Sequence, residues 1–273
     1  MSSDSSNLYG YVPSGIVAIV FGAIFLVLTV LHLWRIVRTK HWFGIATLVG
    51  GIFEVIGLAA RAYSHHDALA KGPYIIQVLL ILLAPIIFSA AIYMFLGRLI
   101  RATGHAELSF IRINILTKLF VLGDVICFFI QASGAGKLVN ADTTSAINSA
   151  QNTVLVGLGL QVVFFCIFAL CAVVFHVRIS RPENKMNVDP ALHLNWMLYS
   201  LYFSSAMVVI RNIYRLVEYK TGTSGYLQVH EWPAYVFDIA PMACMMMASL
   251  FWYSADTKAV RVSGSYPLVS QDV

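Results

Sequence analysis

The chain has 273 residues, of which 59% are hydrophobic and only 11% are charged, and its formal net charge is +5. A soluble domain typically has about 45–50% apolar and about 25% charged residues, and a core of this size cannot bury such an apolar surplus. The composition therefore excludes an ordinary cytosolic enzyme, a disordered protein and a disulfide scaffold, and it predicts an integral membrane protein.

Seven apolar runs are long enough to cross a bilayer, which takes about 20 residues. They predict an all-α, polytopic bundle of seven transmembrane helices in a membrane domain spanning 14–254. The expected helices cover 14–34, 42–63, 73–97, 113–133, 153–176, 192–217 and 232–254. A short segment, 1–13, precedes this domain and a tail, 255–273, follows it. The first run lacks the basic flank and the cleavage site of a signal peptide.

The basic residues of the loops predict the orientation of the bundle. Eleven Lys and Arg residues follow the first, third, fifth and seventh runs, whereas only four lie in the loops on the opposite side. Because loop Lys and Arg accumulate on the cytoplasmic side, we expect 1–13 to be exoplasmic and 255–273 to be cytoplasmic. The same rule accounts for the net positive charge, so no nucleic-acid partner is expected.

Ionisable and amide side chains recur within the apolar runs, where each is expensive unless it has a partner or faces a polar cavity. In chain order they are Glu54, Arg61, Gln77, Asp124, Gln131, Gln161, Arg211, Arg215, Glu218, Glu231 and Asp238. At 1.5 Å of rise per residue, Arg211 and Asp238 lie at a similar depth, about 9 Å below the outer ends of their helices. The polar residues therefore gather in the outer half, as an open polar cavity or as a sealed polar network.

Two interpretations of this cluster remain open. In the first, it is a structural ion-pair network of Arg211 with Asp238, Arg61 with Glu54, and Arg215 with Glu218 or Glu231. In the second, it binds a ligand, because five acids stand against three bases and two carboxylates lack a basic partner. On that reading Glu54, Gln77, Asp124, Gln131, Gln161 and Asp238 form the ligand or translocation site, and the remaining charged residues hold it together.

Several function classes lack their signatures. The last run has no lysine for a retinal Schiff base, and no nucleotide-binding loop is present. The His and Cys residues show no metal-ligand spacing, so neither a metal nor a cofactor is expected. Nor do they form a nucleophile–base pair, so catalytic residues are not predicted and an intramembrane enzyme is the least favoured class.

The motifs of the membrane domain resemble those of a known family. They include Glu54-x-x-Gly57-x-x-x-Arg61, Tyr93-x-x-Leu96-Gly97-Arg98, Gly159-Leu160-Gln161 and Arg211-x-x-Tyr214-Arg215-x-x-Glu218. The chain is similar in these positions to the fungal lipid-translocating exporters, the RTA-like seven-helix proteins. The resemblance implies a fungal plasma-membrane protein that handles lipids or toxic amphiphiles and contributes to resistance.

These observations together favour a transporter or translocator of an amphiphilic lipid or toxicant. An acidic excess in a low-dielectric site favours a positive headgroup, such as that of a cationic sphingoid base. The alternative from another class is a seven-helix receptor or sensor that binds the same kind of ligand. Protein partners and the oligomeric state are not predicted.

Overall fold

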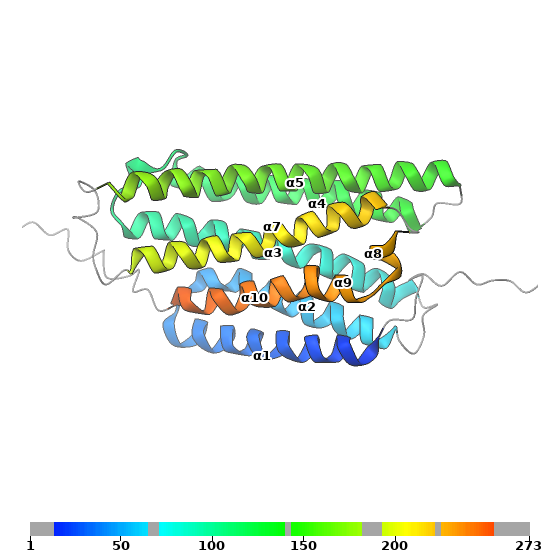
Figure 1. Cartoon of the computed structure of the whole chain (residues 1–273). Coiled ribbons are helices and arrows are strands. Elements are labelled where there is room, and N and C mark those ends of the chain that lie inside the picture. Colours follow the sequence, from blue (N-terminus) through cyan, green and yellow to red (C-terminus); the bar gives the residue numbers. More distant parts are fainter. Residues whose placement is uncertain (1–13, 65–70, 140–142, 182–192, 222–224, 254–273) are drawn as a thin grey trace, which may run out of the picture.

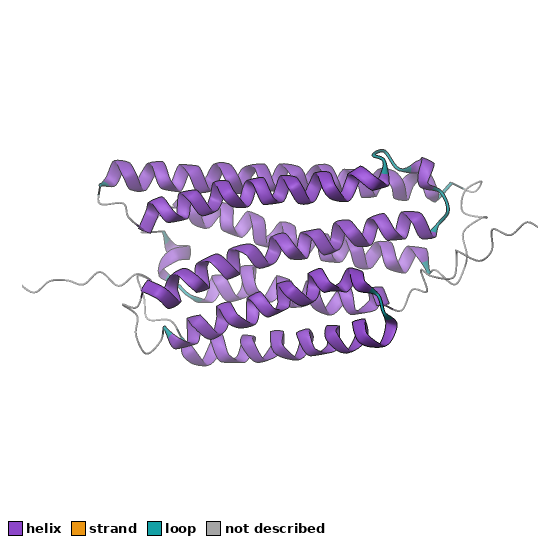
Figure 2. Ribbon diagram, turned by 180° about the vertical axis from the view of Figure 1, so that it is seen from behind, coloured by secondary structure: helices purple, strands orange, loops and turns teal. Residues whose placement is uncertain are grey.

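The computed structural model describes residues 14–64, 71–139, 143–181, 193–221 and 225–253. Within these ranges the regular structure is helical, without strands, and the long helices run side by side along one axis (Figures 1 and 2). The predicted end segments, 1–13 and 255–273, lie outside the described residues.

Six long helices form most of the bundle: α1 (Gly15–Thr39), α2 (Ile45–Tyr63), α3 (Lys71–Ala102), α4 (Ile113–Val139), α5 (Thr144–Ile179) and α7 (Leu194–Thr221). The seventh span is a composite of α9 (Trp232–Ala234), the π turn η4 (Tyr235–Ile239), α10 (Ala240–Ser249) and the 3-10 turn η5 (Leu250–Tyr253). The connections carry three short helical turns: η1 (Trp42–Gly44), η2 (Ala106–Leu108) and α8 (Tyr226–Val229).

Six of these seven segments are long and apolar enough to cross a membrane, and α7 is the exception. Its 28 residues are sufficient in length, but its outer half carries Arg211, Arg215 and Glu218, which lower its hydropathy. These charges point into the bundle, where they pair, and α7 lies alongside the other helices in Figure 1. The predicted all-α polytopic fold is therefore confirmed.

Several helices continue beyond the apolar runs that predicted them. Most clearly, α5 begins at Thr144, whereas its apolar run begins near 153, and the Thr143 hydroxyl accepts a hydrogen bond from Ala146 N at 3.2 Å as an N-cap. With 36 residues, α5 is about 54 Å long, well beyond the roughly 30 Å of a hydrocarbon core. An apolar run marks the part of a helix inside the bilayer, whereas helical hydrogen bonds can continue into water.

Helices that are adjacent in sequence pack together, and α3 lies at the centre, against α2, α4 and α7. Close approach depends on small residues. A Cβ at Gly57 would lie 2.8 Å from Ile81 Cγ1, and one at Gly157 would lie 3.0 Å from the Cys127 carbonyl oxygen. These glycines bring α2 against α3 and α5 against α4, so side chains that face inward there meet partners across a short gap.

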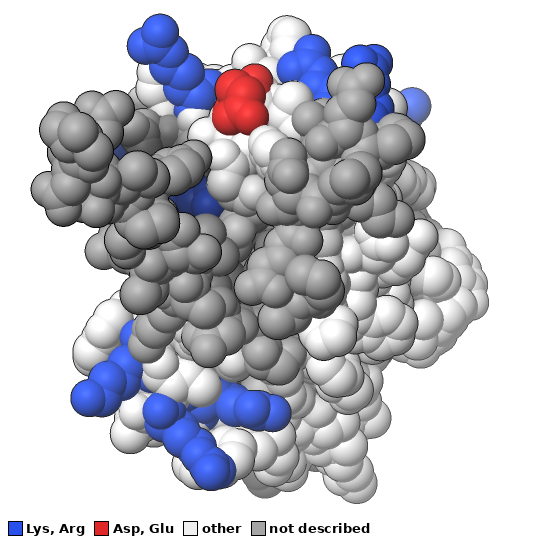
Figure 3. Space-filling model, turned by 90° about the vertical axis from the view of Figure 1, so that its left-hand side faces the viewer, with Lys and Arg blue, Asp and Glu red and all other residues white. Residues whose placement is uncertain are grey.

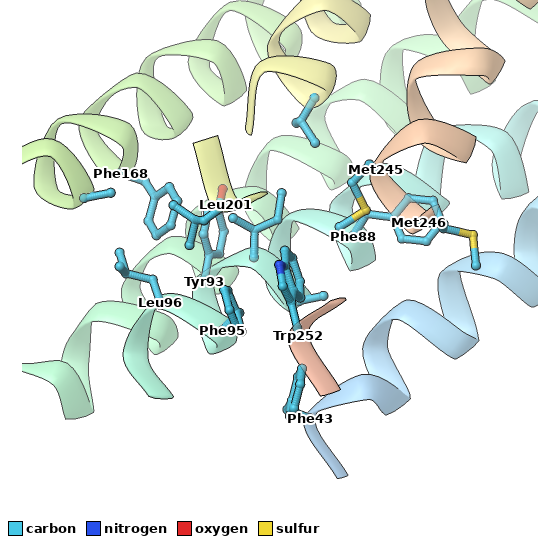
Figure 4. Packing of buried hydrophobic residues seen from close by; sticks show 14 of the residues in the cluster. Phe43, Phe88, Tyr93, Phe95, Leu96, Phe168, Leu201, Met245, Met246 and Trp252 are labelled. Carbon is cyan, nitrogen blue, oxygen red and sulfur yellow. The ribbon is translucent and has the colours of Figure 1, made fainter. Parts of the chain in front are cut away.

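The half of the bundle that contains the end of α3 has an aromatic core. The rings of Phe95 and Trp252 stack with centroids 4.2 Å apart, and Phe43 packs at 6.2 Å from Phe95 (Figure 4). Lys and Arg dominate the charged surface of this end among the described residues (Figure 3). This end carries the positive charge expected of a cytoplasmic face, while the orientation itself stays a prediction.

Candidate functional site

The half of the bundle opposite the Lys- and Arg-rich end, which we expect to be the outer half, holds a cluster of buried ion pairs between α7 and the π turn η4. Arg211 Nε lies 2.8 Å from Asp238 Oδ1, and both side chains are 2% exposed. The pair predicted from their equal depth is therefore present, although the Nε–H is not aligned with the oxygen as in a hydrogen bond. Asp238 also contacts Arg215 through Nη2, and Arg215 Nη1 donates to Glu218 Oε2 at 3.1 Å. One carboxylate thus serves two arginines.

Two prolines shape the backbone around this cluster. Pro85 has no N–H, so the carbonyl of Ile81, four residues earlier in α3, loses its helical partner. Arg211 Nη2 donates to that oxygen at 2.8 Å, so one guanidinium joins the proline-containing turn of α3 to the carboxylate of η4. On the other side, Pro241 follows the π turn, in which the Ala240 N–H bonds to the carbonyl of Tyr235. Such π turns occur often at functional sites.

A second ion pair closes the outer end, with a partner that the sequence did not indicate. Arg61 Nη2 lies 2.9 Å from Glu231 Oε1, and the Tyr235 hydroxyl donates to the same oxygen at 3.0 Å. Both carboxylate oxygens of Glu231 also accept from Ser14 N. Arg61 therefore pairs with Glu231 and not with Glu54, because Glu54 lies two turns deeper on α2, about 10 Å along the helix.

Glu54 is left without an ion pair among the described residues. Its side chain is 1% exposed, and its Oε2 atom has no hydrogen-bond partner. It is close enough to Asp238, Arg211 and Arg215 to interact with them electrostatically, but contacts none of them. Glu54 thus adds a carboxyl group to the inner side of the cluster, and one of its buried oxygens is available to a hydrogen-bond donor.

Asp124 lies apart from the arginines, in an aromatic environment. The Tyr93 hydroxyl donates to Asp124 Oδ2 at 2.9 Å, whereas Oδ1 has no partner. The ring of Tyr93 packs against Phe168 at 4.4 Å and Phe120 at 5.5 Å between centroids. Asp124 is 1% exposed and forms no ion pair within the described part of the chain. Phenol and carboxylate therefore form a polar pair inside an apolar wall.

The amide side chains of the predicted site are buried too. Gln131 Nε2 donates to Gln161 Oε1 at 2.8 Å, which links α4 to α5. Gln77 is buried on α3, one turn outward from Ile81. The structure thus brings Glu54 and Asp238 together with the arginines, and places Asp124 and the Gln131–Gln161 pair elsewhere. Each predicted ligand-site residue is at most 6% exposed, so these six side chains are buried away from bulk solvent in this conformation, whereas Arg215, Glu218 and Glu231 are 13% to 19% exposed.

His32 was not among the predicted site residues, and it lies at the centre of a polar cluster at the other end of the bundle. His32 is fully buried, with Nε2 3.1 Å from the Met246 carbonyl and Nδ1 3.0 Å from the Tyr253 hydroxyl. A carbonyl only accepts, so Nε2 carries the proton and Nδ1 of the neutral ring accepts from tyrosine. The signal was the buried stripe of α1, since His32 lies at helical spacing from Phe25 and Ile36.

Metal ligands are not assembled anywhere in the described residues: no group of three His, Cys, Asp or Glu side chains could hold an ion. The buried groups instead offer carboxylate, amide and phenol oxygens to a ligand. Chemically, they suit the binding of a positively charged or hydrogen-bonding headgroup.

Comparison with known proteins gives a consistent set of relatives. A family model described as "RTA1 like protein" matches residues 47–257. "Protoporphyrin uptake protein 1" of Saccharomyces cerevisiae is 31% identical, over 91% of this chain and 93% of the relative. "Protein RTM1" of the same species is 36% identical, over 76% of this chain and 65% of the relative. The yeast "Sphingoid long-chain base transporter RSB1" is 28% identical, over 89% and 72% respectively. No solved structure matches.

Proposed function

The chain belongs to the RTA1-like protein family, and we propose that it moves an amphiphile with a cationic headgroup across the membrane. Two relatives are named for transport or uptake, one of sphingoid long-chain bases and one of protoporphyrin. A sphingoid base combines a positive headgroup with a long apolar tail, and it is the ligand class that we propose for this chain. Neither direction nor energy source forms part of the proposal.

The observation that carries the proposal is the pair of buried carboxylate oxygens without partners, Glu54 Oε2 and Asp124 Oδ1. A buried acceptor with no donor costs about 1–3 kcal/mol, and more when it is charged. The arginines of the cluster are engaged by Asp238, Glu218 and Glu231. An ammonium headgroup would supply the missing donors, and its charge would offset the acidic excess in a low-dielectric site.

The closed state of the site supports a translocation cycle. Since the carboxylates are sealed from solvent, a ligand reaches them only if the helices around them separate. Arg211 of α7 contacts both the composite seventh span and α3. Neither of these two segments has regular α-helical hydrogen bonding at that point. We propose that opening occurs between these two segments and that the ligand stabilises one of the two forms.

The proposed location is the fungal plasma membrane, where the protein would contribute to resistance against toxic amphiphiles. The apolar run of α5, 153–176, has 24 residues and is about 36 Å long. A plasma membrane rich in sterol and sphingolipid has a hydrocarbon thickness of about 32–33 Å, against about 27 Å for the endoplasmic reticulum. The length of α5 fits the thicker membrane.

The test uses the purified full chain in phosphatidylcholine liposomes. The probe is a fluorescent single-chain lipid with a primary ammonium headgroup, whose N–H groups can donate hydrogen bonds, and the comparison lipid carries a sulfonate on the same chain. We expect the cationic lipid to change leaflets faster than in protein-free liposomes, and the anionic lipid to show no such gain. Equal acceleration of both lipids would refute recognition of positive charge. Binding of the cationic lipid without movement would instead identify a receptor or sensor.

Variants of the buried carboxylates then test which of them bind the headgroup. Glu54→Gln and Asp124→Asn should each slow the cationic lipid, because each removes one buried negative charge while preserving side-chain size. Glu107→Gln is the matched control, since the side chain of Glu107 is 66% exposed on the loop after α3 and lies outside the cluster. Equal flux for all three variants would show that neither buried carboxylate binds the headgroup.

A further inference from the structure

The hydroxyl side chains of this bundle divide into two groups. Most bond to a carbonyl of their own helix, as Thr29 does to Phe25 O at 2.6 Å and Thr153 to Ser149 O at 2.9 Å. This is the usual way for a membrane helix to satisfy a hydroxyl. Ser204 and Ser205 on α7 are buried, at 0% and 7% exposure, yet neither Oγ atom has a partner. Their hydroxyls are therefore available to something other than their own helix.

Asn212 adds two more atoms of the same kind. Its side chain is 1% exposed, and neither Nδ2 nor Oδ1 has a hydrogen-bond partner. An amide side chain can make up to four hydrogen bonds, and leaving them all unmade in a dry interior is expensive. Ser205 and Asn212 are seven residues apart, as are Ser204 and Arg211, so two adjacent rows of polar side chains run along α7.

These rows run inward along α7 from the ion-pair cluster, toward the depth at which Asp124 lies. Arg211 fixes the register of α7 against α3, because it bonds to Ile81 O. Leu201 lies ten residues inward from Arg211, about 15 Å along α7, and Tyr93 lies twelve residues inward from Ile81, about 18 Å along the antiparallel α3. Figure 4 shows Leu201 and Tyr93 in the same part of the core, where Tyr93 binds Asp124.

We propose that ordered water molecules occupy this face of α7 and form a hydrated path between Arg211 and the Tyr93–Asp124 pair. Buried polar groups without a protein partner commonly bind internal water, which needs two to four polar neighbours. Ser204, Ser205 and Asn212 supply neighbours along the path, and Asp124 Oδ1 supplies one at its inner end. A polar headgroup that moves between Arg211 and the Tyr93–Asp124 pair would keep hydrogen bonds to this water along the whole path.

Radiolytic hydroxyl labelling of the unmodified protein, read by mass spectrometry, tests this path because labelling of a buried side chain requires adjacent water. Leu201 and Val208 lie on the path and are 0% exposed, and Leu99 is equally buried in the aromatic half. We expect Leu201 and Val208 to be labelled several-fold faster than Leu99. Labelling as slow as that of Leu99 at both positions would overturn the proposal.

Asn212→Leu provides a second measurement. The substitution removes four hydrogen-bonding sites from the path, so labelling of Leu201 and Val208 should fall several-fold while that of Leu99 stays unchanged. If the wild-type labelling persists in this variant, the water is not held where we place it. The comparison within the unmodified chain stands even if the variant does not fold. If labelling is as expected but the protein moves no lipid, the water path is supported and the proposed function is refuted.

Discussion

The hydrogen bond between Arg211 and the carbonyl of Ile81 allows the stability effects of substitutions at Arg211 and Pro85 to be predicted quantitatively. Arg211→Leu removes the ion pair with Asp238, which costs about 3–5 kcal/mol when one side of a buried pair is lost. The lower end applies here, since Asp238 keeps its contact with Arg215. The substitution also leaves Ile81 O without a donor, which adds about 1–3 kcal/mol.

Pro85→Ala should repair the second loss and not the first. Alanine restores the N–H that Ile81 O accepts in a regular helix. In the wild-type background, Arg211 already satisfies that oxygen, so the change should have little effect. In the Arg211→Leu background it should recover about 1–3 kcal/mol. The two substitutions are therefore expected to couple by that amount.

Equilibrium unfolding of the four proteins in detergent micelles measures the coupling as a double-mutant cycle. Pro241→Ala is the matched control, because its helical acceptor would be Phe237 O, which Arg211 does not contact. That control cycle should be additive. If Arg211→Leu and Pro85→Ala are also additive within about 0.5 kcal/mol, the arginine does not compensate for the proline.

Four further predictions concern other parts of the chain. Asp124→Asn should fold like the parent but lose movement of the primary ammonium lipid in liposomes; full activity would make the carboxylate structural. Tyr93→Phe, which removes the donor to Asp124, should lower the free energy of unfolding by about 1–3 kcal/mol in detergent, and an unchanged value would argue against the bond. His32→Leu should destabilise by a similar amount, because the buried Tyr253 hydroxyl loses its acceptor, and denaturant titration against wild type decides it. A tag after Val273 should be inaccessible on intact cells, and labelling there would reverse the orientation.

Depth along a helix predicted part of the site correctly. Arg211 and Asp238 were expected at equal depth, and they form an ion pair. Equal depth did not reveal that Arg215 also reaches Asp238, because long side chains contact groups more than one turn from their own Cα. Arg61 was paired instead with Glu54 on its own helix, and that pairing is wrong, because Arg61 contacts Glu231, which precedes the seventh apolar run.

The apolar pattern predicted the number and order of the helices better than their ends. Hydropathy reports where a helix lies in the bilayer, so the polar start of α5 at Thr144 was missed. Hydropathy also did not indicate that His32 is buried, because a lone histidine near a helix end is typical of the membrane interface. The buried ring of His32 contacts the Tyr253 hydroxyl and the Met246 carbonyl. Residue types alone do not show which backbone carbonyls are left free where an α-helix changes to a 3-10 turn.

The long α5 has a practical consequence for imaging the molecule. About ten residues at its start, 144–153, continue past the apolar run as rigid helix, at the end of the bundle opposite the Lys- and Arg-rich face. A small membrane protein offers few features for aligning particles in electron cryomicroscopy, because most of its mass is hidden in the micelle. A helical fusion partner joined in register at Thr144 would extend α5 without a hinge and provide a marker outside the detergent belt.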